Sequence, residues 1–333
     1  MYKSMICRFY STQHAKASVN KDALLFLRKA TGFPLQNCRK AVEQFGEDLD
    51  AAQKWLRQKA LEEGWSKMAT VRKTAAGLIG LKTDEKRGRG LMLELNCETD
   101  FVAKNAKFQE LTSEICRHIL ESNSVNMAIK ASEMDSFLRK SLMMKEEASS
   151  LAVQGLENFN TIADLIASYV GQIGEKISLK RALYVETKSS ECSLIGYAHP
   201  KSAPIDGVLM GQLGTIVAYG HRGDSNTFTS NAAGVDPKAL GGMICQQIVG
   251  MNPKTLGTFV DGDVIQTSPL PKNSGAEETE ESYENQLTKL DGGETELLKQ
   301  DFLLQPEMKF GKFLQMNGAK VYDFVRFKCG EDD

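Results

Sequence analysis

Residues 91–102, Leu-Met-Leu-Glu-Leu-Asn-Cys-Glu-Thr-Asp-Phe-Val, mark a change from one kind of structure to another. The first half is largely apolar and predicts a strand. The stretch from Ala103 to Leu120 carries a helical pattern, so the second half, Cys97 to Val102, forms a strand-to-helix corner. A loop lies at the surface because its backbone is costly to bury. We therefore expect Asp100 and Phe101 to be exposed, as a carboxylate and an aromatic ring that can enter a partner protein.

A purely structural explanation of the corner is the alternative. Asp100 could cap the N-terminus of the following helix, and Phe101 could fasten that helix to the core. The six corner residues alone favour this explanation. The rest of the chain reverses the preference.

Length and composition indicate an ordinary globular protein. The 333 residues suffice for two or three domains, and 41% hydrophobic and 25% charged residues are typical values. A net charge of −2 provides no basic field for nucleic acid. The apolar runs are far shorter than the roughly 18 residues of a membrane-spanning helix. We therefore expect neither nucleic acid nor a membrane as a partner.

The seven cysteines are scattered, and no two of them form a CxxC pair. Zinc sites and disulfide frameworks both require clustered cysteines, so the sequence predicts neither. Cys38, Cys116 and Cys245 lie among apolar residues at helical spacing and are expected to be buried. This usage fits a reducing compartment.

The N-terminus has the composition of a targeting segment. Residues 1–21 contain four basic residues and no acidic one, which is typical of a mitochondrial transit peptide. The stretch from Arg8 to Ser11 looks like a matrix-protease site with cleavage after Tyr10. The alternative is a basic tail without a targeting role. The transit peptide predicts a mature protein in the mitochondrial matrix.

Residues 22–61 predict a compact unit of three helices. The first places its apolar residues 24–27 near one side and ends at Gly32, with Pro34 beyond it. The second carries an apolar stripe at helical spacing, made of Cys38, Ala41, Val42 and Phe45. The third begins after Asp48, a good N-cap. A basic connector, 62–75, follows as continued helix or as a mobile tether.

An internal repeat begins after the connector and divides the rest into modules of 76–190 and 191–333. Three pairs of segments recur in the same order: Leu78-Ile79-Gly80 with Leu194-Ile195-Gly196, strand 91–96 with strand 215–220, and Ile115-Cys116 with Ile244-Cys245. Each half is expected to form a hairpin, a corner and a helix, with a longer hairpin loop (200–214) in the second. The sequence thus predicts a duplicated α+β core.

Other elements are predicted between and after these repeats. Helices are expected over 131–148 and 161–173, and Gly174 should end the second of them. A strand with an irregularity before Leu183 follows. Residues 261–298 are strongly acidic and predict a linker or a frayed helix. The chain should end in a strand over 321–329.

The sequence offers no support for catalysis. His199 and His221 fall at strand ends of the second hairpin and could approach each other, but no third group is available to complete a catalytic arrangement. Motifs for a nucleophile elbow, a zinc hydrolase, a phosphate-binding loop or a dinucleotide fold do not occur. We therefore expect no enzyme activity, metal, cofactor or small-molecule substrate.

Nearly the whole mature chain resembles the elongation factor Ts family. The resemblance rests on these stretches: 27–32 (Leu-Arg-Lys-Ala-Thr-Gly), 38–41 (Cys-Arg-Lys-Ala), 46–49 (Gly-Glu-Asp-Leu), 55–57 (Trp-Leu-Arg), 94–105 (Glu-Leu-Asn-Cys-Glu-Thr-Asp-Phe-Val-Ala-Lys-Asn), 174–177 (Gly-Glu-Lys-Ile), 249–253 (Val-Gly-Met-Asn-Pro), 303–306 (Leu-Leu-Gln-Pro) and 325–327 (Val-Arg-Phe). Lys176 departs from the family, which usually has Asn there. The absence of a heptad run in the second half matches the shorter mitochondrial type.

The resemblance implies a ubiquitin-associated-like N-terminal domain and a partner, the GTPase mitochondrial elongation factor Tu. It implies that the corner enters the GTPase, disturbs Mg²⁺ and phosphate binding, and so promotes GDP release. The corner residues concerned are Thr99, Asp100, Phe101 and Val102. Further candidates for partner contact are Gly174, Glu175, His199 and His221.

Two rival functions remain at this point. The Gly32-Phe33 turn is similar to the turn with which ubiquitin-associated domains grip ubiquitin, although Thr31 replaces the usual Met. The chain could therefore be a ubiquitin-binding adaptor. An oxidoreductase or transferase with a two-lobed core is the other alternative, and it lacks a cofactor motif.

Overall fold

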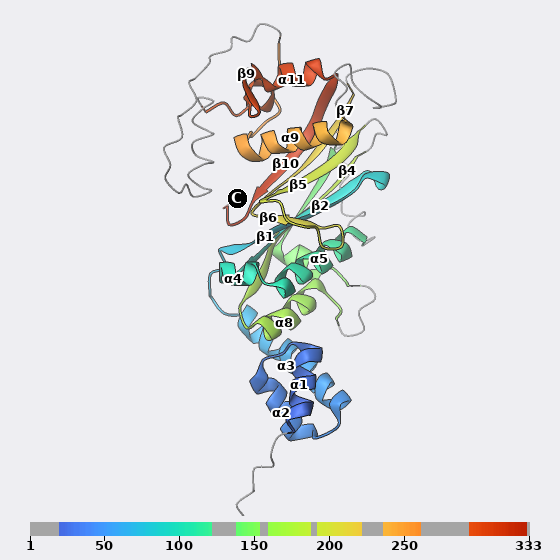
Figure 1. Cartoon of the computed structure of the whole chain (residues 1–333), viewed down its shortest axis with the longest axis vertical. Helices are drawn as coiled ribbons and strands as arrows, with labels where there is room; N and C mark the ends of the chain where they lie inside the picture. Colours follow the sequence, from blue (N-terminus) through green and yellow to red (C-terminus); the bar gives the residue numbers. More distant parts are fainter. Residues whose placement is uncertain are drawn as a thin grey trace, which may run out of the picture.

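The protein is an α+β protein in which a helical unit, a first sheet and a second sheet follow one another along the longest axis (Figure 1). The computed structural model describes residues 20–121, 138–153, 159–187, 192–221, 236–260 and 293–331. The predicted transit peptide, residues 131–137 of the predicted helix 131–148, and most of the predicted acidic linker lie outside these residues.

Three helices form the N-terminal unit: α1 (Lys21–Thr31), α2 (Leu35–Phe45) and α3 (Leu49–Met68). Gly32 ends α1 at a φ of 68°, and the Asp48 side chain caps α3 by accepting from the Ala51 amide, as predicted. The apolar stripe of α2 faces the core. Residues 24–27 do not share one side, because Leu27 is buried whereas Leu25 and Phe26 are exposed.

Helix α3 runs beyond the predicted unit and packs on α8 (Ile162–Ile173) of the first module. Two glycines allow the close approach. A Cβ on Gly64 would lie 1.8 Å from the carbonyl oxygen of Ala167, and one on Gly171 would lie 2.1 Å from that of Ala60. Residues 62–68 of the predicted connector are therefore helix, and α3 belongs to both units.

The first sheet has five antiparallel strands in the order β3-β4-β2-β1-β6. Their bounds are β1 Ala76–Asp84, β2 Arg89–Cys97, β3 Leu138–Met144, β4 Ile177–Thr187 and β6 Leu209–Gly211. The short helix η1 (Glu85–Arg87) closes the β1–β2 hairpin. Helices α5 (Ala106–Glu121) and α8 cover one face of the sheet.

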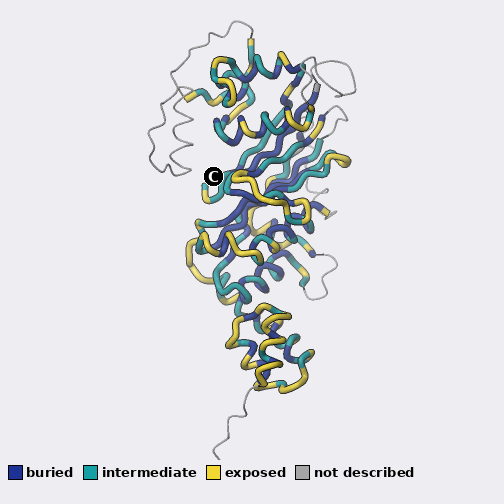
Figure 2. Tube along the Cα trace, in the orientation of Figure 1, coloured by how far each residue is buried: buried dark blue, intermediate teal, exposed yellow. Residues whose placement is uncertain are grey.

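The second sheet consists of β5 (Ser193–His199), β7 (Leu213–His221) and β10 (Ala319–Lys328), in the order β10-β7-β5. One face packs on the first sheet, where Ile79 and Met92 meet Ile216 and Phe327. Helix α9 (Pro237–Met251) and α11 (Phe310–Met316) cover the other face, as does the turn η2 (Leu297–Lys299). The core thus has four layers, helices outside and two sheets inside. Figure 2 shows the central strands as the most continuously buried part of the chain.

A buried ion pair ties the C-terminal end to the first sheet. Glu94 on β2 is fully buried and accepts from Arg181 Nε at 2.9 Å. The same carboxylate accepts from the amides of Asn96 (side chain, 3.2 Å) and Gly330 (backbone, 2.8 Å). The end of β10 is therefore held by the strand that leads to the corner.

Three sequence predictions are wrong in their local structure. Residues 138–144 of the predicted helix 131–148 form strand β3, which pairs with β4 from Leu138↔Thr187 to Met144↔Arg181, and among its described residues helix begins only at α7 (Lys145–Ser150). The helix predicted over 103–120 is two helices, α4 (Asp100–Ala103) and α5, separated where Asn105 accepts from the Lys107 amide. The second hairpin loop contains β6, which joins the first sheet beside β1.

Other predictions are confirmed. Gly174 ends α8 at a φ of 93°, and β4 contains a bulge between Leu179 and Arg181. The final strand is β10. The acidic segment ends earlier than predicted, because Leu297 is buried against the second sheet's helices. Helix α11 and the small hairpin before it, formed by β8 (Asp301–Phe302) and β9 (Gln305–Lys309), were not predicted as elements from the sequence.

Candidate functional site

The corner predicted from the sequence is present at the end of β2. Thr99 caps α4 by accepting from the Val102 amide at 3.4 Å, and Val102 and Ala103 are buried. This arrangement turns Asp100 and Phe101 outward. Phe101 is 81% exposed. The structural alternative is therefore wrong on both points, since Thr99 rather than Asp100 is the cap and Phe101 does not reach the core.

Glu175 holds the corner in place from the neighbouring turn between α8 and β4. Its carboxylate accepts from the Thr99 amide at 3.1 Å and from the Thr99 hydroxyl at 3.0 Å. Gly174 makes this turn possible, because its left-handed conformation favours glycine. The structure brings these two predicted contact residues to the corner, with direct roles in shaping it.

Glu98, which was not predicted as a site residue from the sequence, forms a second connection. It accepts from the Lys176 amide at 2.8 Å and from Arg72 Nη1 at 3.1 Å. The backbone hydrogen bond and the arginine lower the pKa of Glu98, so this carboxylate is charged at neutral pH. The Lys176 ammonium group donates to the Thr70 carbonyl, and Lys67 donates to the Gly174 carbonyl at 2.9 Å.

Three segments thus meet at the corner: 98–99 after β2, 174–176 before β4, and the connector after α3. The only signal in the sequence was the combination of basic residues in the connector with an acid beside the corner. Their pairing could not be deduced, because the contacts span 26 and 78 residues of sequence.

The charges at the tip are accessible. Asp100 lies 3.5 Å from Lys104, and the two side chains are 64% and 79% exposed. An ion pair so exposed contributes little free energy in water, so a partner protein can bind the Asp100 carboxylate with little loss of stability in this protein. Cys97 donates its thiol hydrogen to the Thr99 carbonyl at 3.1 Å, and burial raises its pKa to about 12. Cys97 is therefore a neutral structural group.

The two histidines predicted as candidates do not come together. His199 ends β5 opposite Leu213, whereas His221 ends β7 opposite Ala319. Eight residues of β7 separate these positions, a span of about 26 Å. His199 is exposed, and its ring stacks on Tyr197 at 6.5 Å between centroids. The approach that the sequence left possible therefore does not occur.

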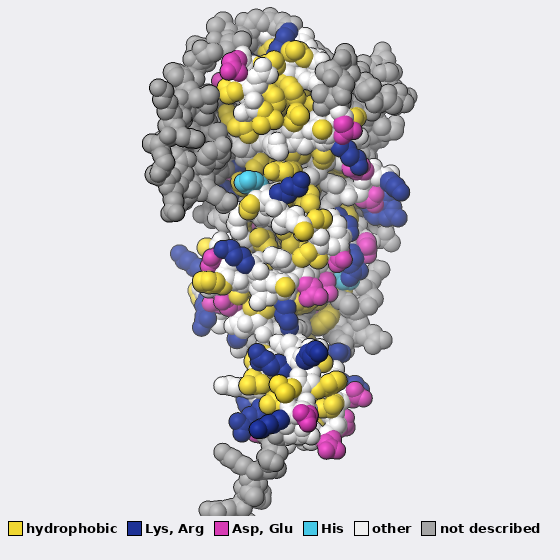
Figure 3. Space-filling model, in the orientation of Figure 1, with side chains coloured by type: hydrophobic (Ala, Val, Ile, Leu, Met, Phe, Trp, Pro, Cys, Tyr) yellow, Lys and Arg dark blue, Asp and Glu magenta, His cyan; other side chains and the backbone are white. Residues whose placement is uncertain are grey.

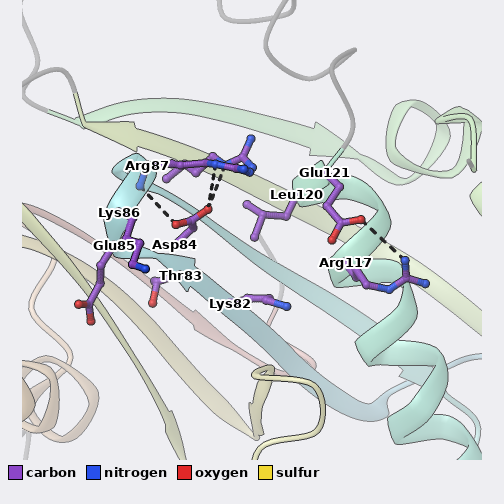
Figure 4. Close-up of a pocket in the computed structure, with 10 residues that line it drawn as sticks. Lys82, Thr83, Asp84, Glu85, Lys86, Arg87, Arg117, Leu120 and Glu121 are labelled. Carbon is purple, nitrogen blue, oxygen red and sulfur yellow. Dashed lines mark hydrogen bonds and ion pairs between the residues drawn. The ribbon is translucent and has the colours of Figure 1, made fainter.

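A cavity of about 450 Å³ lies beside the β1–β2 hairpin and the C-terminal end of α5 (Figure 4). Some of its charged side chains are paired: Arg87 and Arg89 both lie 3.7 Å from Asp84, and Arg117 lies 3.7 Å from Glu121. Neither histidine nor cysteine lines it. Its lining therefore offers no His- or Cys-based catalytic pair.

Within the described residues, no cluster of three or more His, Cys, Asp or Glu side chains could hold a metal ion. No helix among them has the length and apolar character needed to cross a membrane. The described cysteines Cys38, Cys97, Cys116, Cys192, Cys245 and Cys329 are all free thiols.

The N-terminal turn differs from what a ubiquitin adaptor requires. Phe33 is only 3% exposed and belongs to the core of the three-helix unit. Thr31 and Gly32 lie beside Lys107 of α5, which donates to the Thr31 carbonyl at 3.4 Å. The turn therefore faces the first module and does not present its aromatic ring to a partner.

Comparisons with known proteins agree on one family. The sequence model described as "Elongation factor TS" matches residues 98–331, and the one described as "Elongation factor Ts, mitochondrial, N-terminal" matches residues 6–66. The protein named "Elongation factor Ts, mitochondrial" of Branchiostoma floridae is 35% identical over 340 residues, which cover 98% of this chain and 95% of the relative. Its namesake in Brugia malayi is 36% identical, covering 92% and 86%, and that in Mus musculus is 32% identical, covering 96% and 86%.

Proposed function

The chain belongs to the elongation factor Ts family, and from this premise we propose that it binds elongation factor Tu in the mitochondrial matrix and promotes release of GDP. Release of GDP allows the GTPase to be reloaded with GTP for the next cycle of translation elongation. The protein acts by binding alone and performs no catalytic chemistry of its own. GDP dissociation is the step that it accelerates.

The exposed Phe101 on a rigid corner is the observation that carries this proposal. An aromatic ring that is 81% exposed in the free protein is free to be buried in a partner. Thr99, Glu175 and Glu98 fix the backbone beneath it, so little ordering is required on binding. Asp100 adds a carboxylate beside the ring, which can accept from backbone amides at a helix terminus of the GTPase.

The mechanism follows from linkage. In GTPases Mg²⁺ bridges phosphate and protein oxygens, so the geometry around the metal controls how fast GDP leaves. A factor that binds the nucleotide-free state better than the GDP state weakens GDP binding by the same ratio. The corner would enter the GTPase near the Mg²⁺ ion and displace the GTPase groups that hold the metal. A thousandfold faster release of GDP requires that the activation free energy fall by about 4 kcal/mol.

The corner alone cannot supply this energy, because complete burial of one Phe provides only about 1.5–3 kcal/mol. Additional contacts are therefore required. We assign them to the N-terminal unit and to the second module. His199 is exposed and remains a candidate there. His221, at the far end of β7, would belong to a separate contact.

We further infer that the N-terminal unit is a ubiquitin-associated-like domain and that the core arose by duplication. In both modules a hairpin is followed by a helix and flanked by a third strand, β4 or β10. Leu78 pairs with Leu95, and its counterpart Leu194 pairs with Ala218. This register supports the repeat, with strand 91–96 equivalent to 214–219, one residue earlier than the sequence suggested.

The test is release of fluorescently labelled GDP from purified mitochondrial elongation factor Tu, with the chain at substoichiometric concentration. We expect the GDP dissociation rate to rise in proportion to the concentration of the chain. A dissociation rate that stays at its spontaneous value would contradict the proposed function. Tight binding without accelerated release would contradict the exchange mechanism specifically.

A further inference from the structure

The connector after α3 leaves the helix at Ala69 and reaches β1 at Ala76. It is anchored at two points that flank a single residue. On one side the Thr70 carbonyl accepts from Lys176, and on the other Arg72 lies 3.1 Å from Glu98. The residue between these anchors is Val71, whose side chain is fully exposed.

These anchors place the connector against the corner. Glu98 binds Arg72 of the connector and the Lys176 amide of the α8–β4 turn, and it precedes Phe101 by only three residues. The connector therefore runs beside α4 along one edge of the molecule (Figure 1). Figure 2 shows this stretch and the start of α4 as neighbouring exposed segments.

The arrangement is unusual for a simple tether. A tether needs no fixed backbone, and an apolar β-branched side chain gains nothing from complete exposure to water. Here two side-chain contacts order the backbone on both sides of Val71. The contacts that fix the connector thus hold the apolar side chain of Val71 in solvent, on a segment that is bound to Glu98, three residues before Phe101.

We propose that Val71 is a second apolar contact for the same GTPase, beside Phe101. This inference rests on the proposed function, and it concerns the extent of the corner's contact surface. The partner site would be a continuous apolar surface that receives both side chains, with room for Arg72 and Asp100 at its rim. Arg72 is a positioning residue, because it fixes the backbone that presents Val71.

The structure also explains why the connector is suited to this role. Lys67 at the end of α3 donates to the Gly174 carbonyl, so the same turn that positions Thr99 also holds the start of the connector. The three-helix unit, the connector and the corner therefore approach a partner as one body. Binding of Val71 and Phe101 would not require separate ordering steps.

The test compares Val71→Ser with the full-length wild type for binding to nucleotide-free mitochondrial elongation factor Tu. Loss of the two methyl groups from an apolar contact should weaken binding about tenfold. The matched control is Leu142→Ser on the edge strand β3, which removes an exposed apolar side chain two strands away from β2, the strand that leads to the corner. We expect the control to bind like the wild type.

A double-mutant cycle tests the positioning role. Arg72→Ala should also weaken binding, and it should cause no further loss in a Val71→Ser background, because the fixed backbone then presents no apolar group. Fully additive losses would overturn the positioning role of Arg72.

Phe101→Ala in the same assay separates this inference from the proposed function. If Phe101→Ala binds weakly and Val71→Ser binds like the wild type, the Val71 contact is refuted and the exchange function stands. If neither variant loses affinity, both the wedge and the Val71 contact are refuted.

Discussion

Phe101→Ala is the most informative change in this chain, because its effects on folding and on function should separate completely. Phe101 leaves most of its apolar surface in water in the free protein, since the residue is 81% exposed. The helix cap comes from Thr99, and the buried anchor of α4 comes from Val102 and Ala103. None of these contacts involves the Phe101 ring.

The magnitudes follow from this exposure. Substitutions at such surface positions change the free energy of unfolding by about 0.5 kcal/mol or less, which is within about 2 °C in melting temperature. Full burial of a Phe provides about 1.5–3 kcal/mol, and the part still exposed (81%) corresponds to about 1.2–2.4 kcal/mol. If this energy is realised in the exchange transition state, the GDP release rate falls about eight- to sixty-fold.

The assay is labelled-GDP release from mitochondrial elongation factor Tu, with circular dichroism melting as the measure of folding. Leu142→Ala is the control, because it truncates another exposed apolar residue of the first module (52% exposed). We expect normal exchange from the control and normal melting from both variants. Exchange at the wild-type rate by a correctly folded Phe101→Ala variant would refute the reasoning.

Three further predictions concern the scaffold. Gly171→Ala forces α8 away from a carbonyl oxygen of α3, so the free energy of unfolding, measured in urea, should fall by about 1–3 kcal/mol. The control is Gly242→Ala on α9, where an added Cβ meets nothing within 4 Å and should not be destabilising. Equal stability of the two variants would contradict the close approach of α3 and α8. Glu94→Gln removes the buried carboxylate that accepts from Arg181 Nε and should cost about 3 kcal/mol in the same measurement, and a neutral effect would show that this ion pair is dispensable. The pKa of Glu98 is lowered in the folded state, so its stabilising contribution is complete above about pH 4.3 and is lost as the pH falls through the folded-state pKa. The difference in free energy of unfolding between wild type and Glu98→Gln should therefore shrink between about pH 7 and about pH 3. A difference that stays constant over this range would contradict the prediction.

Local rules predicted those parts of the molecule that are specified by neighbouring residues. The caps at Gly32, Asp48 and Gly174 follow from backbone preferences that act within one helix turn. The exposed corner followed from an apolar strand that ends beside a helical pattern. The irregularity in β4 was visible because the alternation of apolar residues shifts by one position.

Long-range pairing explains the failures. Residues 138–144, Leu-Arg-Lys-Ser-Leu-Met-Met, are mostly good helix formers, yet they pair with β4 because this edge of the first sheet offers unpaired backbone groups. Strand β6 forms inside a loop for the same reason, beside β1 at the other edge. Neither edge can be recognised before the sheet itself is known.

The candidate site divides along the same line. The sequence identified the two residues whose side chains project into solvent, Asp100 and Phe101, because exposure follows from local geometry. It did not identify what holds them, because Glu175 and Glu98 reach the corner only through folding of the α8–β4 turn and the connector. The resemblance to the family pointed to Gly174 and Glu175 as contact residues, whereas their hydrogen bonds give them a role in shaping the corner.

The exposed wedge and the deeply layered core are connected by one physical requirement. A side chain can contribute its full burial energy to a partner only if the backbone below it does not lose freedom on binding. At the corner this freedom is already lost in the free protein, because Val102 is buried one residue after Phe101 and Thr99 is bound by Glu175 two residues before it. A substitution that loosens this support, such as Glu175→Gln, should therefore weaken exchange without altering the wedge itself.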